Sequence, residues 1–210
     1  MIESSMEISQ QSIRDMRFKI AGWLSICIGI LEIPLFIFSI AARSDPSLKP
    51  VLLYLVFLPL IFLRWICVVY IFIQFKRLLN ERYDYYKADL IITIQIIVSI
   101  LIGAKDILMA NIEALFPLSE LAGGLSAVFF IFSLLVDGTI GIFLGVSLLA
   151  IREDPYGSLR LYAIITIISS SCLITILLLP IAGLLFLLSC VILGMIFLKA
   201  AEAEADVEFV

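Results

Sequence analysis

Six long apolar stretches constrain the fold of this chain more than any other feature. A helical run of about 20 apolar residues matches the roughly 30 Å hydrocarbon core of a bilayer. The sequence predicts such spans at Ile20–Ala42, Val51–Phe75, Leu90–Ala110, Leu121–Ile151, Ser158–Leu179 and Ile181–Leu198. Hydrophobic residues make up 63% of the chain and charged residues 15%, with a mean hydropathy of +1.18. Soluble domains carry about 25% charged residues. We therefore expect one all-α membrane domain over residues 1–210, with a short N-terminal segment at 1–19 and an acidic tail at 200–210.

The apolar stretch between Arg160 and Lys199 is expected to contain the last two of these spans. No charged residue lies between Arg160 and Lys199. A single helix of that length would measure about 60 Å, twice the thickness of the hydrocarbon core. Pro180 and Gly183 lie at the midpoint, and proline interrupts a helix. We predict a tight hairpin there.

The first and fourth spans leave alternatives open. Ser39-Ile40-Ala41 resembles a signal-peptide cleavage site, but the apolar run before it is too long and contains Glu32, which favours a retained span. The fourth span is long for one crossing. It is expected to tilt, to bend at Asp137-Gly138, or to begin as an interfacial segment after Pro117.

Lys and Arg are divided unevenly between the two sides of the predicted bundle. One side holds both termini and the loops at 76–89 and 152–160. Its ten bases are Arg14, Arg17, Lys19, Lys76, Arg77, Arg82, Lys87, Arg152, Arg160 and Lys199, and the other side has Arg43, Lys49 and Lys105. Cytoplasmic loops carry the excess of bases. Both termini are therefore expected in the cytoplasm, and the plasma (inner) membrane is the expected location.

Glu32, Arg64 and Asp137 each lie near the middle of a different span. An ionised side chain at the bilayer centre costs roughly 2.5–3.5 kcal/mol on insertion scales, so these residues need partners. Counted from the nearest cytoplasmic base at 1.5 Å per residue, their depths are about 20, 18 and 22 Å. This shared depth predicts a single intramembrane cluster and a candidate ligand site or ion pathway.

Small residues share a helix face with two of these charges. Gly22, Ser25 and Gly29 lie on the stripe of Glu32, and Ser126, Ser133, Gly141 and Gly145 lie on the stripe of Asp137. Small residues at such spacings let helices approach closely. The charges are therefore expected on the seams between helices, away from lipid.

A cluster of two acids and one base has a surplus carboxyl group. That group should hold a proton, because burial disfavours its charged form, or bind a cation. Asp137 is the stronger candidate, because Glu32 has the longer reach toward Arg64. The same cluster equally fits a structural clamp.

The third predicted span holds three secondary candidates. Lys105 and Asp106 are expected near the headgroups opposite the cytoplasmic side. Because they are adjacent, they should point in different directions around a helix. Gln95 on the same span fits an interhelical hydrogen bond better than a ligand contact.

The composition argues against several chemistries. The chain contains no histidine, so histidine-held haem, most zinc hydrolase sites and Ser–His or Cys–His catalysis are excluded. Its cysteines are single residues in four different spans, at positions 27, 67, 172 and 190. These are typical of small buried hydrophobes. We expect no enzyme, cofactor, metal site or nucleic-acid partner.

Two functional hypotheses follow. In the first, the charged cluster binds or transports a small solute, ion or proton. In the second, the chain is a structural or accessory membrane subunit whose charges hold helices or a partner together. In size and expected topology the chain is similar to the substrate-binding subunits of energy-coupling-factor vitamin transporters, without sharing a motif with them. Expected partners are the lipid bilayer and other membrane subunits, or a second copy bound through Gly141 and Gly145.

Overall fold

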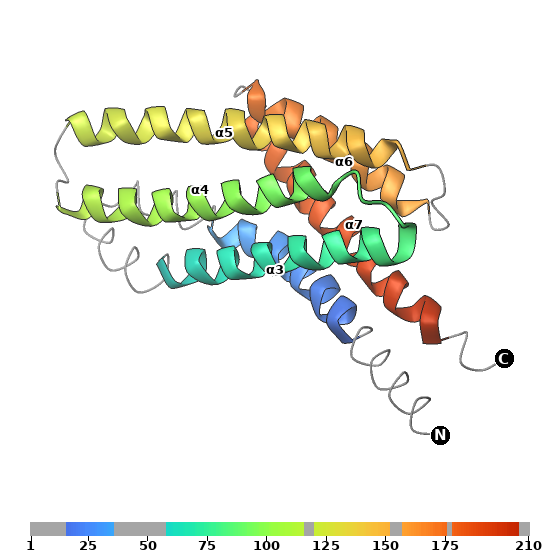
Figure 1. Cartoon of the computed structure of the whole chain (residues 1–210). Coiled ribbons are helices and arrows are strands. Elements are labelled where there is room, and N and C mark those ends of the chain that lie inside the picture. The colour runs from blue at the N-terminus through green and yellow to red at the C-terminus, as the bar shows by residue number, and fades with distance from the viewer. Residues whose placement is uncertain (1–15, 36–57, 116–119, 152–156, 176–177, 206–210) are drawn as a thin grey trace.

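The chain folds into a bundle of helices (Figure 1). The computed structural model describes residues 16–35, 58–115, 120–151, 157–175 and 178–205. The six helices in these ranges are Met16–Leu35, α3 (Leu58–Tyr83), α4 (Asp89–Leu115), α5 (Glu120–Leu149), α6 (Ser158–Ile174) and α7 (Leu179–Ala205). All except α6 are long and apolar enough to cross a membrane. The predicted all-helical bundle of six helices is confirmed.

Neighbouring helices in the sequence are neighbours in space. Each helix from α3 to α6 packs on the one that follows it. The helix Met16–Leu35 closes the bundle, because it contacts both α7 and α3. Its Ser25 Oγ donates a hydrogen bond to the carbonyl oxygen of Cys190 in α7, at 2.8 Å. Its Glu32 forms an ion pair with Arg64 of α3.

An aromatic cluster fills the bundle near one of its ends. The rings of Phe18 and Phe197 stack with their centroids 6.2 Å apart. Phe75 of α3 meets Phe197 edge-on at 6.3 Å and Tyr162 of α6 at 5.6 Å. All four side chains are buried. These contacts bring the first described helix, α3, α6 and α7 to a common level.

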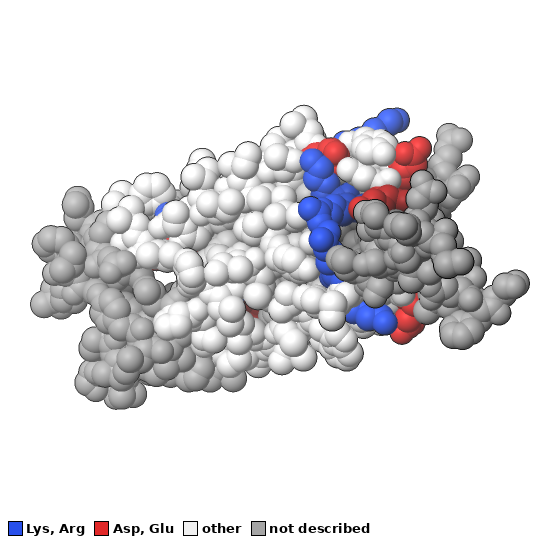
Figure 2. Space-filling view, turned by 60° about the horizontal axis from the view of Figure 1, so that its bottom comes forward, with Lys and Arg blue, Asp and Glu red and all other residues white. Residues whose placement is uncertain are grey.

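The outer surface of the bundle is apolar along most of its length. Figure 2 shows a broad surface with only small charged spots, bounded at one end by a band of Lys and Arg. Large apolar side chains such as Leu90, Val128 and Leu184 are exposed on this surface. Contiguous exposed apolar surface of this extent is expected of a protein that is surrounded by lipid. The chain is an integral membrane protein.

The predicted loop at 76–89 is too long. Helix α3 continues to Tyr83, so only residues 84–88 connect it to α4. Lys76 Nζ lies 3.4 Å from Asp89 Oδ2, and Asn80 donates to the same oxygen at 3.2 Å, which ties the last turns of α3 to the start of α4. The predicted loop was too long because the span was assumed to end before the basic residue Lys76. Lys and Arg are good helix formers and extend a helix beyond the apolar core.

The hairpin between the last two helices is present, but it precedes the predicted position. Helix α6 ends at Ile174 and α7 begins at Leu179. Pro180 lies in the first turn of α7, where a missing N–H leaves no helical hydrogen bond unmade. Gly183 lies inside the same helix. Proline therefore starts α7 and does not interrupt it.

The alternatives for the first and fourth spans stay open. Helix α5 runs continuously through Asp137-Gly138, and the expected tilt or bend of this span stays a prediction. The segment after Pro117 and the sequence Ser39-Ile40-Ala41 lie outside the described residues.

Candidate functional site within the membrane spans

The small-residue face of the first described helix packs against α7. Gly22 and Gly29 are buried, and a Cβ atom on Gly22 would lie 3.0 Å from the carbonyl oxygen of Gly194. Gly194 faces Gly22 in the same way, because a Cβ on Gly194 would lie 2.8 Å from the Gly22 oxygen. The two backbones therefore cross closely at this glycine pair, as predicted from the spacing of small residues.

This crossing positions Glu32 to reach α3. Arg64 Nε lies 2.5 Å from Glu32 Oε1, so the predicted proximity of these two charges is confirmed. The Arg64 guanidinium also lies 5.6 Å from the ring centroid of its neighbour Trp65. The side chains of Glu32 and Arg64 are 29% and 28% exposed. The pair therefore lies at a seam between two helices, as expected; its interacting atoms are buried, while the rest of both side chains is partly exposed.

Asp137 belongs to a different contact. Gln95 Nε2 of α4 donates a 2.7 Å hydrogen bond to Asp137 Oδ1 of α5. Gln95 is buried, and its role as an interhelical hydrogen-bond donor is confirmed. Within the described ranges Arg64 forms its ion pair with Glu32, and no ion pair joins it to Asp137.

The expected common depth of the three charges was wrong. Trp65, next to Arg64, packs on Gly103 of α4, whereas Asp137 contacts Gln95 of the same helix. These two points of α4 are eight residues apart, which is about 12 Å along a helix. The depth count assumed that Lys76 marks the end of its span. Because α3 continues beyond Lys76, the count placed Arg64 at the wrong level.

The small-residue face of α5 is shared between two neighbours. Cβ atoms added to Gly138 and Gly145 would lie 2.9 Å from Ser170 O and 2.8 Å from Ala163 O in α6. Gly141 likewise packs on Ser170. Ser133 and Asp137 instead face α4.

Within this chain, Gly141 and Gly145 pack on α6. Binding of a second copy through these glycines, or of another membrane subunit, stays a prediction.

Lys105 and Asp106 form a contact of their own. Lys105 Nζ lies 2.7 Å from Asp106 Oδ1 and 3.2 Å from Ser133 Oγ of α5. The expectation that the two adjacent side chains diverge was wrong, because the flexible lysine side chain reaches back to its neighbour. The pair also links α4 to α5 through Ser133.

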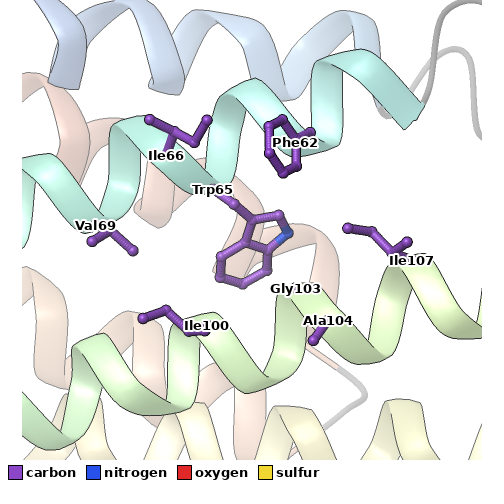
Figure 3. Close-up of a pocket in the computed structure, with 8 residues that line it drawn as sticks. All are labelled: Phe62, Trp65, Ile66, Val69, Ile100, Gly103, Ala104 and Ile107. Atoms are coloured by element: carbon purple, nitrogen blue, oxygen red, sulfur yellow. The ribbon is translucent and has the colours of Figure 1, made fainter.

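The structure contains an apolar groove that the sequence did not indicate. It lies between α3 and α4 and has a cavity volume of about 410 Å³. Its lining consists of Phe62, Trp65, Ile66, Val69, Ile100, Gly103, Ala104 and Ile107. Figure 3 shows the indole ring of Trp65 extending from α3 toward Gly103 of α4. None of the predicted site residues lines this groove.

Comparisons with known proteins add no assignment. No protein-family model, curated protein or solved structure matches this chain. The function therefore has to be argued from the contacts described above.

Proposed function

We propose that this chain is a non-enzymatic structural or accessory subunit of a membrane complex, and that its intramembrane polar residues hold its own helices in place. One observation carries the proposal. The charged candidates form separate contacts between helices, and each contact joins a different part of the bundle.

The separation of these contacts supports a structural role. Glu32 with Arg64 joins the first described helix to α3, whereas Gln95 with Asp137 joins α4 to α5. In a bilayer, helices associate through packing and interhelical hydrogen bonds, because lipid supplies no hydrophobic drive between them. Polar pairs at separate seams fit that requirement, and the groove between α3 and α4 has an apolar lining.

A proton-binding role for Asp137 is the second candidate. Asp137 accepts a hydrogen bond from Gln95 Nε2, and the Oε1 of Gln95 is buried without a partner in the described structure. A protonated carboxyl group could donate to that oxygen, so that the acid and the amide would share two hydrogen bonds. This geometry favours a neutral Asp137, either as a fixed tie or as a proton-coupling group.

The substitution Asp137→Asn separates the two roles, because it mimics the neutral acid. In vesicles with an imposed pH gradient, the structural proposal expects the wild-type protein and Asp137→Asn to leave the gradient as stable as in protein-free vesicles. Their melting temperatures should also agree, because asparagine keeps the acceptor for Gln95. If the wild-type protein makes the pH gradient decay faster and Asp137→Asn abolishes this effect, the result would contradict the proposal and support proton transfer.

We propose further that both termini lie in the cytoplasm and that the membrane is the plasma (inner) membrane. The excess of bases on the side of the termini supports this orientation. Labelling of single cysteines introduced at either terminus, with a reagent that cannot cross the membrane, should require permeabilised cells. Labelling in intact cells would contradict it.

A further inference from the structure

Five exposed basic residues are distributed around one end of the bundle. They are Arg17, Lys19, Arg77, Lys87 and Lys199, here called the basic belt. In the described part of the chain none of the five forms an ion pair, in contrast with Lys76, which pairs with Asp89. Figure 2 shows a band of Lys and Arg at the border of the apolar surface. The belt therefore presents positive charge that no ion pair in the described part of the chain neutralises.

The aromatic cluster fixes the level of the belt. Phe18 lies between two belt residues in the sequence, and Phe75 and Phe197 each precede one by two positions. Because the Phe197 ring contacts both of the other rings, the bases of three separate helices are held at the same height. The belt is thus a built feature of the fold.

Neighbouring residues indicate that this height is the headgroup region. Trp23, about one turn from Lys19 on the apolar side, is 61% exposed, and Tyr86 in the α3–α4 connection is 60% exposed. Exposed Trp and Tyr are typical of the membrane–water interface. Acids lie about one turn beyond the bases, with Glu81 after Arg77 and Glu202 after Lys199. In Figure 2 most acidic residues lie on the outer side of the band.

We infer that the basic belt binds the phosphate groups of anionic phospholipids in the adjoining leaflet, in preference to zwitterionic lipids. The formal charge of the chain is −4, so the net charge of the protein does not supply this preference. Lys and Arg at the membrane surface attract anionic headgroups over a Debye length, which is about 8 Å at physiological salt. They also donate charge-assisted hydrogen bonds to phosphate oxygens. The belt therefore selects lipid by contact.

Trp23 provides a reporter beside the belt. The chain has two tryptophans, so Trp65→Phe leaves Trp23 as the only one. The full-length Trp65→Phe protein is reconstituted in phosphatidylcholine, and its fluorescence is quenched with phosphatidylglycerol or phosphatidylcholine brominated near the headgroup. We expect the anionic lipid to bind about fivefold more strongly, which is the ratio that one nearby base produces. Salt at about 1 M should reduce the ratio, because the Debye length falls to about 3 Å.

Substitution of the belt tests the residues themselves. In a variant with all five bases changed to Gln, the binding ratio should fall to near one, while quenching by phosphatidylcholine and helix content stay unchanged. Lys105→Gln, in the half of α4 that lies away from the belt, is the matched control and should keep the full ratio. If the variant with five substitutions fails to fold, the double variant Arg77→Gln with Lys199→Gln should lower the binding ratio in part.

Three results would overturn the inference. The first is equal quenching by the two lipids in the unsubstituted belt. The second is a preference that survives removal of the five bases. The third is displacement of the lipid by soluble glycerol phosphate, which would identify a site for free phosphate.

Discussion

The two halves of the bundle are held together in different ways. In the half nearest the basic belt, Phe75, Leu78, Leu79 and Phe197 are entirely buried. In the other half, the same helices carry mostly partly or fully accessible side chains. Phe62 of α3, for example, is 58% exposed. Contact between α3 and α4 there depends on Trp65 against Gly103 and leaves the apolar groove open.

The half that provides most of the stability is therefore not the half that holds the intramembrane ion pair. Within a bilayer, close packing and hydrogen bonds drive helix association. The belt half has the dense packing, whereas the far half holds α3 to the first described helix through Glu32 and Arg64. Substitutions in the belt half should therefore have the larger effects on stability.

The largest effect is expected for Phe75→Ala. Phe75 is completely buried and touches Tyr162 and Phe197, so truncation leaves a cavity that three helices line. We expect a loss of about 3 kcal/mol, the lower limit for a buried phenylalanine, because lipid already solvates apolar groups. Reversible unfolding in mixed micelles measures it. Phe62→Ala on the same helix is the control and should change stability by less than about 0.5 kcal/mol. Equal losses would contradict the contrast between the two halves.

A smaller effect, with opposite signs in the two halves, is expected for alanine substitutions in α5. In Gly145→Ala the new Cβ would lie 2.8 Å from the carbonyl oxygen of Ala163, which must move. This overpacking should cost about 1–3 kcal/mol. Gly124→Ala, in the same helix, meets nothing within 4 Å and should stabilise the protein by up to about 1 kcal/mol. Unfolding free energies of the two variants that shift in the same direction would show that α5 does not pack on α6 as described.

The sequence predicted the helices better than it predicted which helices pack against one another. Apolar run length predicts a span directly, because the thickness of the bilayer sets the length of the helix. Small-residue spacing also identified the face on which Gly22 and Gly29 pack. It did not identify α7 as the partner, because a single sequence contains no information on which helices touch.

The candidate cluster failed for a related reason. Equal numbers of residues from a base give equal depths only if every base marks the end of its span. Lys76 lies inside α3 and pairs with Asp89, so the count misplaced Arg64. The groove beside Trp65 left no signal at all, because its lining residues resemble any other lipid-facing positions. A glycine opposite a tryptophan becomes informative only once α3 and α4 are known to be adjacent.

The central claim is that the intramembrane charges form separate ties and not one site. Two double-mutant cycles measured by unfolding in mixed micelles test it, using Glu32→Gln, Arg64→Gln and Asp137→Asn. The account predicts a coupling energy of about 1–2 kcal/mol between Glu32 and Arg64, because substitution of either residue leaves the other without a counter-charge. Arg64 and Asp137 should be additive within about 0.5 kcal/mol. A coupling between Arg64 and Asp137 as large as that between Arg64 and Glu32 would contradict the account and restore a single cluster.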